Sequence, residues 1–479
     1  MVTVPFRLEA TYARALPALA QSWRATTPSN PSMVLTNPAL ATELGIDPAW
    51  LGTPEAVAAL SGAEAIDGTE PVALLYAGHQ FGSYSPRLGD GRALLLGEIV
   101  TDDSRRFDLH LKGSGRTPFA RGGDGLASLG PMLREYLMGE AMHALGIPTT
   151  RSLAVIETGD SVRRETMLPG AILVRVASSH IRVGTFQYAA ATGDINLVRA
   201  LADHAIARHH PRALESDQPY LALFDAVVET QAALIAEWLL VGFIHGVMNT
   251  DNMTISGETI DYGPCAFMER VDPLTVFSSI DQGGRYAFGR QPSIGQWNLA
   301  RLAETLLGLI DDDPEQAASA ATEVLGTFGE RFSARWHAGM RARLGLAEHR
   351  DGDETLNEDL IATLHERGLD LISTMRSLST HLRGARVDLG GWTERWETRL
   401  ATEGREPMAV AAEMDLVNPF VVPRNLAVQQ ALDTAVAGDL TEFHRLMSEL
   451  ADPYTQRDGL DDLALPGPAA PGFRTFCGT

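Results

Sequence analysis

The sequence predicts an α+β fold in which a small β-rich lobe is followed by a larger α-helical lobe. Two observations lead to this prediction. Between about residues 71 and 184, apolar segments have the length and alternation of β-strands. Beyond about residue 194, apolar residues recur at the spacing of helices instead. At 479 residues, the chain is long enough for one large two-lobed unit or for two domains.

Shifts in this pattern predict four consecutive segments. Residues 1–70 are helical and loop-rich, with several prolines, and are expected to form an N-terminal extension. Residues 71–184 form the β-rich lobe, and residues 185–385 form the α-helical lobe. Residues 386–479 form a C-terminal helical extension that ends in a cysteine-bearing tail.

The β-rich lobe contains the clearest strand patterns. Residues 93–100 are almost entirely apolar, as in a buried strand. Residues 106–112 alternate between apolar and polar side chains, so one face of this strand is expected to be polar. A hairpin is expected from strands at 151–155 and 166–176, with residues 157–160 in its turn.

Helical spacing is clearest in four stretches. Within residues 129–145, leucine or alanine recurs at steps of four, and Gly146 is expected to end that helix. In the second lobe, residues 221–244, 295–309 and 358–378 show the same periodicity.

Composition limits the classes of partner. The chain is 45% hydrophobic and 21% charged, which is typical of a globular protein in aqueous solution. A net charge of −22 argues against a nucleic-acid-binding surface. The longest apolar run, residues 232–244, is too short to span a bilayer and is interrupted by Glu237. Because no secretory signal is evident, a cytoplasmic protein without a membrane partner is expected.

Lysine usage singles out one position. Of the 39 basic residues, 38 are arginine and only Lys112 is lysine, which indicates a site that needs a compact ammonium group. Lys112 ends the alternating strand, and Glu135 lies on the helix that follows. In kinase-like folds such a pair orients the phosphates of a nucleotide. The alternatives are a surface lysine and an ordinary solvated glutamate.

Glycine-rich segments surround this strand. Residues 78–82 and 89–92 precede it, and residues 113–125 follow Lys112 directly. Glycines let backbone N–H groups approach a phosphate, although plain turns and a mobile connection would need them too. Arg175 and Arg182 flank a polar connection between the lobes, where they would either clamp a terminal phosphate or form surface ion pairs.

Residues 245–263 resemble the catalytic segment of a kinase with one residue displaced. The position two after His245, where a kinase has its catalytic aspartate, holds Val247. An aspartate stands instead at Asp251, beside Asn252. Asn252 and Asp261 offer oxygen ligands of the kind that Mg²⁺ takes, and Asp251 is near enough to accept a proton. The alternative is a polar loop stabilised by Asx turns.

Four motifs resemble a known family. Residues 76–82 (YAGHQFG), 88–92 (LGDGR), 111–119 (LKGSGRTPF) and 245–252 (HGVMNTDN) are similar to those of the selenoprotein O family, known as SelO or, in bacteria, YdiU. The similarity is nearly collinear from about residue 12 to the C-terminus. It implies a bilobal protein-kinase-like fold that binds ATP in a flipped orientation. It also implies transfer of AMP to Ser, Thr or Tyr hydroxyls of other proteins.

The resemblance also implies roles for individual residues. Asn252 and Asp261 would bind Mg²⁺ or Mn²⁺, Asp251 would accept the proton, and Glu135 would support the lysine. The residues expected to contact the nucleotide are Gly89, Gly91, Arg92, Lys112, Asp124, Gly125, Arg175, Arg182 and Asp261.

The two cysteines have two interpretations. Composition alone predicts two free thiols in a reducing compartment, because two cysteines cannot form a disulfide framework. The family resemblance implies instead a redox-sensitive link between Cys265, near the proposed metal site, and Cys477 in the tail.

The sequence therefore predicts a protein adenylyltransferase that depends on ATP and Mg²⁺ and is subject to redox regulation. One alternative is a kinase that transfers the γ-phosphate with Asp251 as its base. Another is a non-catalytic pseudokinase scaffold that binds ATP without turnover. The acceptor proteins and the oligomeric state do not follow from the sequence.

Overall fold

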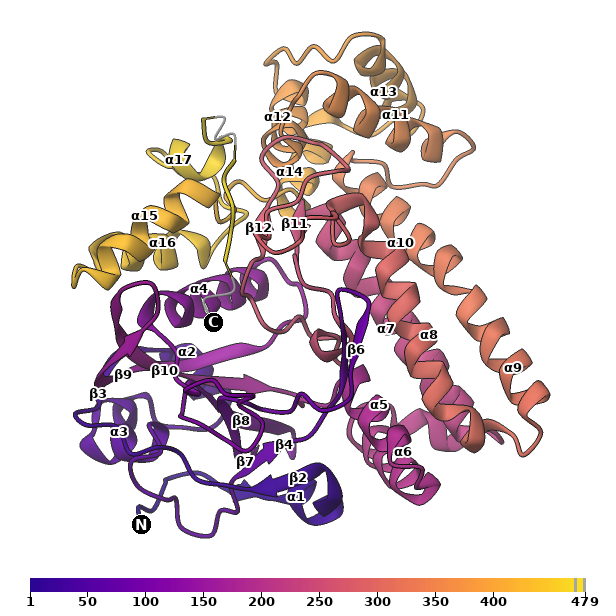
Figure 1. Ribbon diagram of the computed structural model, residues 1–479. Helices are drawn as coiled ribbons and strands as arrows, with labels where there is room; N and C mark the ends of the chain where they lie inside the picture. Colours follow the sequence, from indigo (N-terminus) through magenta and orange to yellow (C-terminus); the bar gives the residue numbers. More distant parts are fainter. Residues whose placement is uncertain (469–471, 477–479) are drawn as a thin grey trace.

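The computed structural model describes residues 1–468 and 472–476. The chain has the bilobal, kinase-like α+β fold that the sequence predicted, with an antiparallel sheet in the N-terminal part and a larger helical C-terminal part. In Figure 1 the sheet (indigo and purple) lies below and to the left of the helices, and the last helices (yellow) lie above α4 (Leu129–Ala144).

The main sheet is built from eight antiparallel strands. Its order is β2-β4-β7-β8-β10-β9-β3, and β1 pairs with β7. The strands are β1 (Leu8–Glu9), β2 (Ala20–Ser22), β3 (Ser32–Thr36), β4 (Val72–Leu74), β7 (Ala93–Val100), β8 (Arg106–Lys112), β9 (Arg151–Arg163) and β10 (Met167–Ala177). Three of these strands come from the first 36 residues, which were expected to be helical and loop-rich. The beginning of the chain therefore completes the sheet.

Both faces of the sheet are covered. Helices α2 (Pro38–Glu43) and α3 (Pro54–Leu60) contribute to an apolar core on the face that carries Leu109 and Leu111. The opposite face packs against α4 and the helical lobe. Consequently the polar residues of β8 are also buried, and the polar face expected for this strand lies inside the molecule.

The predicted turn at residues 157–160 is wrong. Strand β9 continues through these residues to Arg163, and β10 begins at Met167. The turn-like sequence instead marks an irregularity, because the pairing of the two strands shifts register between Pro169 and Ala171. Gly159 has φ of 75°, and a side chain there would lie 2.8 Å from the backbone of Asn30. Glycine in this strand thus permits close contact with a neighbouring segment.

The helical lobe begins after a short connection from β10. Its helices are α5 (Val183–Ala191), α6 (Ile195–His209), α7 (Pro219–Leu240), α8 (Gln291–Ile310), α9 (Pro314–Gly326), α10 (Phe328–Arg343), α11 (Asp353–Glu366), α12 (Leu371–Leu382), α13 (Gly391–Ala401), α14 (Pro407–Val417), α15 (Asn425–Val436), α16 (Thr441–Leu450) and α17 (Asp461–Ala464). The helix expected at 358–378 is divided into α11 and α12, because Gly368 adopts φ of 61° between them. Helix α7 ends at Leu240, and the next residues form the short strand β11 (Phe243–Ile244), paired with β12 (Ala266–Phe267).

A small hairpin joins the two lobes. Strands β5 (Gly78–Gln80) and β6 (Ser83–Ser85) pair with each other and stand between the sheet and helices α7 and α8 in Figure 1. β5 contacts α5 and a one-turn 3₁₀ helix, Thr250–Asn252. Within residues 1–468 and 472–476, no helix combines the length and apolar character needed to cross a membrane.

Candidate active site

A cavity of about 590 Å³ opens between the sheet and the helical lobe. It is bounded by the glycine-rich segments, by β8 and β10, and by the loop that follows α7. All the predicted site residues except the two cysteines line it: Gly89, Gly91, Arg92, Lys112, Asp124, Gly125, Glu135, Arg175, Arg182, Asp251, Asn252 and Asp261. The structure thus brings together residues that are up to 172 positions apart in the sequence.

The inner end of the cavity is a network of buried ion pairs. The Lys112 Nζ atom lies 2.6 Å from Glu135 Oε2 and 2.7 Å from Asp261 Oδ1. The Arg175 guanidinium lies 3.1 Å from the Asp261 carboxylate and 3.4 Å from that of Glu135. Lys112 ends β8, and Arg175 lies on the same face of the adjacent strand β10, which explains why both cations reach the same two carboxylates.

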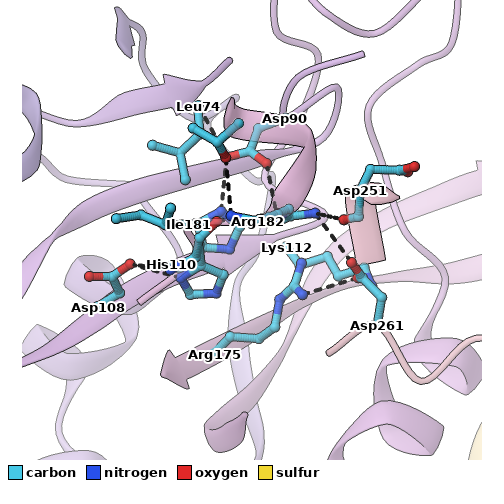
Figure 2. Close-up of polar contacts among 12 residues, drawn as sticks. Leu74, Asp90, Asp108, His110, Lys112, Arg175, Ile181, Arg182, Asp251 and Asp261 are labelled. Carbon is cyan, nitrogen blue, oxygen red and sulfur yellow. Dashed lines mark hydrogen bonds and ion pairs between the residues drawn. The ribbon is translucent and has the colours of Figure 1, made fainter. Parts of the chain in front are cut away.

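Asp261 is the centre of this network. Its carboxylate accepts hydrogen bonds from Lys112 and Arg175, and Arg182 Nη1 lies 3.5 Å from its second oxygen (Figure 2). Burial alone would raise the pKa of Asp261, but the three cations hold it well below its ordinary value. Its φ of 61° is in the left-handed region, which a non-glycine residue adopts only when its surroundings fix it. Asp261 is therefore a fixed anion.

Arg182 connects the ion-pair network at the inner end of the cavity to the loop that carries Asp251. It precedes α5, and its Nη1 donates to the backbone carbonyl of Asp251 at 2.9 Å. Its guanidinium lies 4.3 Å from the centre of the Tyr76 ring, in cation–π contact, and 3.9 Å from Asp90 Oδ1. Figure 2 shows Arg182 between Asp90 on one side and Asp251 and Asp261 on the other. This side chain is almost completely buried.

Asp90 is a site residue that the sequence analysis missed. It lies between Gly89 and Gly91, and its Oδ2 accepts hydrogen bonds from the Leu74 backbone N–H at 3.1 Å and from His110 at 3.0 Å. Burial would raise the pKa of Asp90, but His110 and Arg182 hold it below its usual range. His110 lies on the buried polar face of β8. The alternation of β8 was a usable signal, because polar residues on a strand covered by helices require buried partners.

Gly91 and Gly125 allow the two loops that line the cavity at these positions to pack closely against neighbouring backbone. A side chain at Gly91 would lie 2.9 Å from the Phe119 carbonyl oxygen, and one at Gly125 would lie 2.3 Å from the backbone of Arg116. Asp124 forms an exposed ion pair with Arg164, at 2.7 Å, on the connection between β9 and β10. Arg164 also lines the cavity and was not among the predicted residues.

Asp251 has surroundings unlike those of Asp261. It is only 6% exposed, and burial raises its pKa to about 6. Its Oδ2 accepts one hydrogen bond, from Gln80 Nε2 at 3.2 Å, and its Oδ1 has no hydrogen-bond partner among the described residues. Figure 2 shows its carboxylate pointing away from the cationic cluster. A buried carboxylate with a free oxygen and this pKa is suited to accept a proton near neutral pH.

The hairpin of β5 and β6 holds the loop that carries Asp251. The His79 N–H donates to Thr250 Oγ1 at 2.7 Å, and the Phe81 N–H donates to Asn249 Oδ1 at 3.1 Å. A side chain at Gly78 would lie 2.3 Å from Asp251 Oδ1, so only glycine fits there. Sequence reasoning treated this glycine-containing segment as a phosphate-binding or simple turn and missed Gln80.

Asn252 and Asp261 meet the chemical requirements of a magnesium site. The Asn252 Nδ2 group donates to the Val247 carbonyl at 2.9 Å, which leaves the amide oxygen available as a ligand. Asp261 supplies a permanently ionised carboxylate. The described residues contain no cluster of three or more His, Cys, Asp and Glu suited to a metal ion. A magnesium ion here would therefore take its remaining ligands from phosphates and water, as is common for Mg²⁺.

Cys265 is fully buried four residues after Asp261, and burial raises the pKa of its thiol to about 11. Cys477 lies outside the described residues. Two positions before it, the Thr475 Oγ1 group donates to the carbonyl of Pro264, the neighbour of Cys265, at 2.6 Å.

Comparison with known proteins agrees with this geometry. Residues 6–451 match the family described as "Protein adenylyltransferase SelO". A "Protein nucleotidyltransferase YdiU" of Mycolicibacterium smegmatis is 55% identical over 480 aligned positions, which cover 98% of both chains. The protein of that name from Cereibacter sphaeroides (strain ATCC 17025) is 55% identical over 99% of this chain and 100% of its own. That of Rhodococcus jostii is 51% identical over 98% of this chain and 94% of its own. The chain belongs to the SelO family and is a protein nucleotidyltransferase.

Proposed function

We propose that the protein transfers AMP from ATP to Ser, Thr or Tyr hydroxyls of other proteins, in a reaction that depends on Mg²⁺. One observation carries the proposal. The cations Lys112, Arg175 and Arg182 converge on the carboxylate of Asp261, whereas the carboxylate of Asp251 forms no ion pair with them and has one oxygen without a hydrogen-bond partner among the described residues. The cations and the proton acceptor are therefore at different places along one cavity.

This separation supports a flipped nucleotide. The triphosphate end of ATP carries most of its negative charge, so the inner cations attract the β- and γ-phosphates. The α-phosphate then lies further out, toward Asp251. Gly89, Gly91 and Gly125 line the same cavity, and the absence of a side chain at each lets these loops pack closely against neighbouring segments.

The transfer itself requires a base and a stabilised leaving group. The acceptor hydroxyl oxygen attacks the α-phosphorus, and Asp251 takes the hydroxyl proton. The bond from the α-phosphorus to the bridging oxygen breaks, and pyrophosphate leaves. Lys112, Arg175 and Arg182 stabilise the negative charge that develops on pyrophosphate. Glu135 holds Lys112 in place through their 2.6 Å contact.

Asn252 and Asp261 are proposed to hold the magnesium ion. Bound Mg²⁺ supplies positive charge that offsets the charge of the phosphates. The orientation of the Asn252 amide is set by its bond to Val247, and Asp261 remains ionised because of the cations around it.

We further propose that Cys265 and Cys477 form a reversible disulfide. The contact between Thr475 and Pro264 supports this proposal, because it holds the tail beside the segment that contains Cys265. The buried Cys265 thiol is protonated at neutral pH and is therefore a poor nucleophile.

Labelled ATP tests the proposed reaction directly. ATP labelled at either the α- or the γ-phosphate is incubated with Mg²⁺, a reducing agent and an unfolded protein such as casein. Stable label from the α position only is expected on the acceptor. Asp251→Ala should lower its rate of appearance by about 10²–10⁴-fold, the range for loss of a general base. ATP affinity, measured by calorimetry, should be retained.

Two other outcomes would contradict the proposal. Label from the γ position alone would identify a kinase and exclude the flipped nucleotide. Binding of ATP without transfer to any acceptor would favour the pseudokinase scaffold.

A further inference from the structure

Residues 473–475, near the end of the chain, lie against residues 276–279. The Thr475 N–H donates to the Phe277 carbonyl at 2.8 Å, and the Ser279 N–H donates to the Thr475 carbonyl at 3.0 Å. Ser278 and Thr475 are partners in a parallel bridge. The Phe473 and Phe277 rings meet edge to face, 6.1 Å apart. The tail therefore binds this segment as an added β-strand does, mainly through backbone groups.

Residues 276–279, here called the docking segment, are followed directly by a residue that lines the active-site cavity. Ile280 follows Ser279, lines the same cavity as Asp251 and is 54% exposed. After Ser278 the chain turns, and the Asp281 N–H donates to the Ser278 carbonyl at 3.3 Å. The Asp281 carboxylate accepts hydrogen bonds from the backbone N–H groups of Arg285 and Tyr286, at 2.9 and 2.8 Å.

Tyr286 connects the docking segment to the loop that carries Asp251. Its hydroxyl donates to Asn249 on the catalytic loop. The docking segment is therefore held at a fixed position relative to Asp251.

Little of the tail, residues 472–476, is buried against the docking segment. Within residues 472–476, only Thr475 is buried, at 4% exposure, whereas Phe476 is 68% exposed. A cavity of about 760 Å³ is lined by residues 272–290 and by Gly472, Phe473 and Arg474. Another polypeptide could replace the tail with little loss of buried surface, and the cavity has room for its side chains.

We propose that residues 277–279 are the strand-addition site for the protein acceptor, and that residues 473–475 of the same chain compete for it. This inference rests on the proposed function. An acceptor strand on this edge continues past Ile280 and carries its hydroxyl to Asp251. Backbone N–H and C=O groups recognise an extended chain whatever its side chains, which fits acceptors of unrelated sequence.

Substitution at Thr475 in the full-length chain tests the competition. Thr475→Pro removes the N–H that donates to Phe277 and the hydroxyl that donates to Pro264, whereas Thr475→Ser keeps both. Kinetics are measured with casein and α-labelled ATP under reducing conditions, so that no disulfide holds the tail. Thr475→Pro should lower the KM for casein by about 5–100-fold, the range for loss of two hydrogen bonds, and leave the KM for ATP unchanged. Thr475→Ser should resemble the wild type.

Hydrogen exchange at Ser279 gives a readout independent of turnover. In the wild type, the Ser279 amide should exchange slowly, because Thr475 accepts its hydrogen bond. In Thr475→Pro it should exchange faster, and saturating casein should slow it again.

An unchanged KM for casein in Thr475→Pro, or no protection of Ser279 by casein, would overturn the strand-addition site. If AMP transfer to casein proceeds in those cases, the proposed function still holds. Conversely, protection of Ser279 by casein without any AMP transfer would contradict the proposed function and leave the binding site intact.

Discussion

Two regions of the cavity, the cationic cluster around Asp261 and the loop around Asp251, shift the pKa values of their aspartates in opposite directions. Asp261, at the inner end, is surrounded by three cations, and its pKa is held well below the ordinary value. Asp251, ten positions earlier in the chain, is also buried, but burial raises its pKa to about 6. Gln80 is its one side-chain donor among the described residues.

This contrast fits the two different tasks that we propose for these carboxylates. A carboxylate that stays ionised suits a site that holds cations, and one whose pKa is near neutral suits proton transfer. Both belong to one short segment, so their local sequence does not separate them. The cations come from β8, β10 and the start of α5, and they reach only Asp261 closely. Burial without a cationic partner makes Asp251 different.

Substitution of Asp261 should have the largest effect on stability. Asp261→Asn removes the anion that pairs with Lys112 and Arg175 and leaves buried cations only partly compensated. Loss of one partner from a buried ion pair costs about 3–5 kcal/mol, so the free energy of unfolding should fall by about that amount. Urea unfolding at pH 7.5 measures it, with Asp312→Asn, at an exposed position before α9, as a control. Equal stability of Asp261→Asn and wild type would show that the network is not tightly coupled.

Replacement of Asp251 by Asn should have the opposite effect on the free energy of unfolding. Because its pKa is raised in the folded state, the folded protein binds a proton more tightly than the unfolded chain between about pH 4 and pH 6. The ionised carboxylate therefore destabilises the fold at pH 7.5, and this effect disappears as the pH falls through that window. A shift from 3.8 to about 6 corresponds to roughly 3 kcal/mol.

Asp251→Asn should accordingly raise the free energy of unfolding at pH 7.5, in EDTA, by up to about 3 kcal/mol. The difference from wild type should vanish near pH 4. A variant that is less stable than wild type at pH 7.5 would contradict the raised pKa.

Lys112→Arg tests why the chain has a single lysine. The guanidinium keeps the positive charge but is larger, and Lys112 is buried between Glu135 and Asp261. Overpacking a buried site typically costs about 1–3 kcal/mol, and the KM for ATP should rise as the phosphate-binding geometry changes. The reverse substitution, Arg106→Lys at the partly buried start of the same strand, is the control. Wild-type stability and KM in Lys112→Arg would make the lysine incidental.

The smallest predicted effect concerns Gln80. Gln80→Leu removes the donor to Asp251, so the pKa of Asp251 should rise further. AMP transfer at pH 7 should fall by about twofold, recover at pH 8 and leave the KM for ATP unchanged, because a rise of one pH unit restores the ionised fraction. Gln21→Leu, on the edge strand β2, is the control. A loss that is equal at pH 7 and pH 8 would indicate a structural role for Gln80 instead.

Local patterns predicted two strands of the sheet and helix α4, which packs against it. The strands at Ala93–Val100 and Arg106–Lys112 and the helix at Leu129–Ala144 lie where periodicity indicated. The predicted turn at 157–160 was wrong because contact with Asn30, a neighbour only in the fold, gives Gly159 its conformation. The three strands within the first 36 residues were missed because their stability comes from pairing with β4, β7 and β9.

The sequence by itself identified twelve of the residues that line the cavity and the family to which the chain belongs, because motifs and residue types are local properties. It also singled out Lys112. Only the tertiary structure decided which partner each charged side chain contacts. The roles of Asp90 and Gln80, the opposite pKa shifts of Asp251 and Asp261, and the docking of Thr475 beside Pro264 all depend on contacts between distant segments. Burial and electrostatic pairing arise from three-dimensional neighbours, and neighbours on separate segments of the chain leave no local pattern.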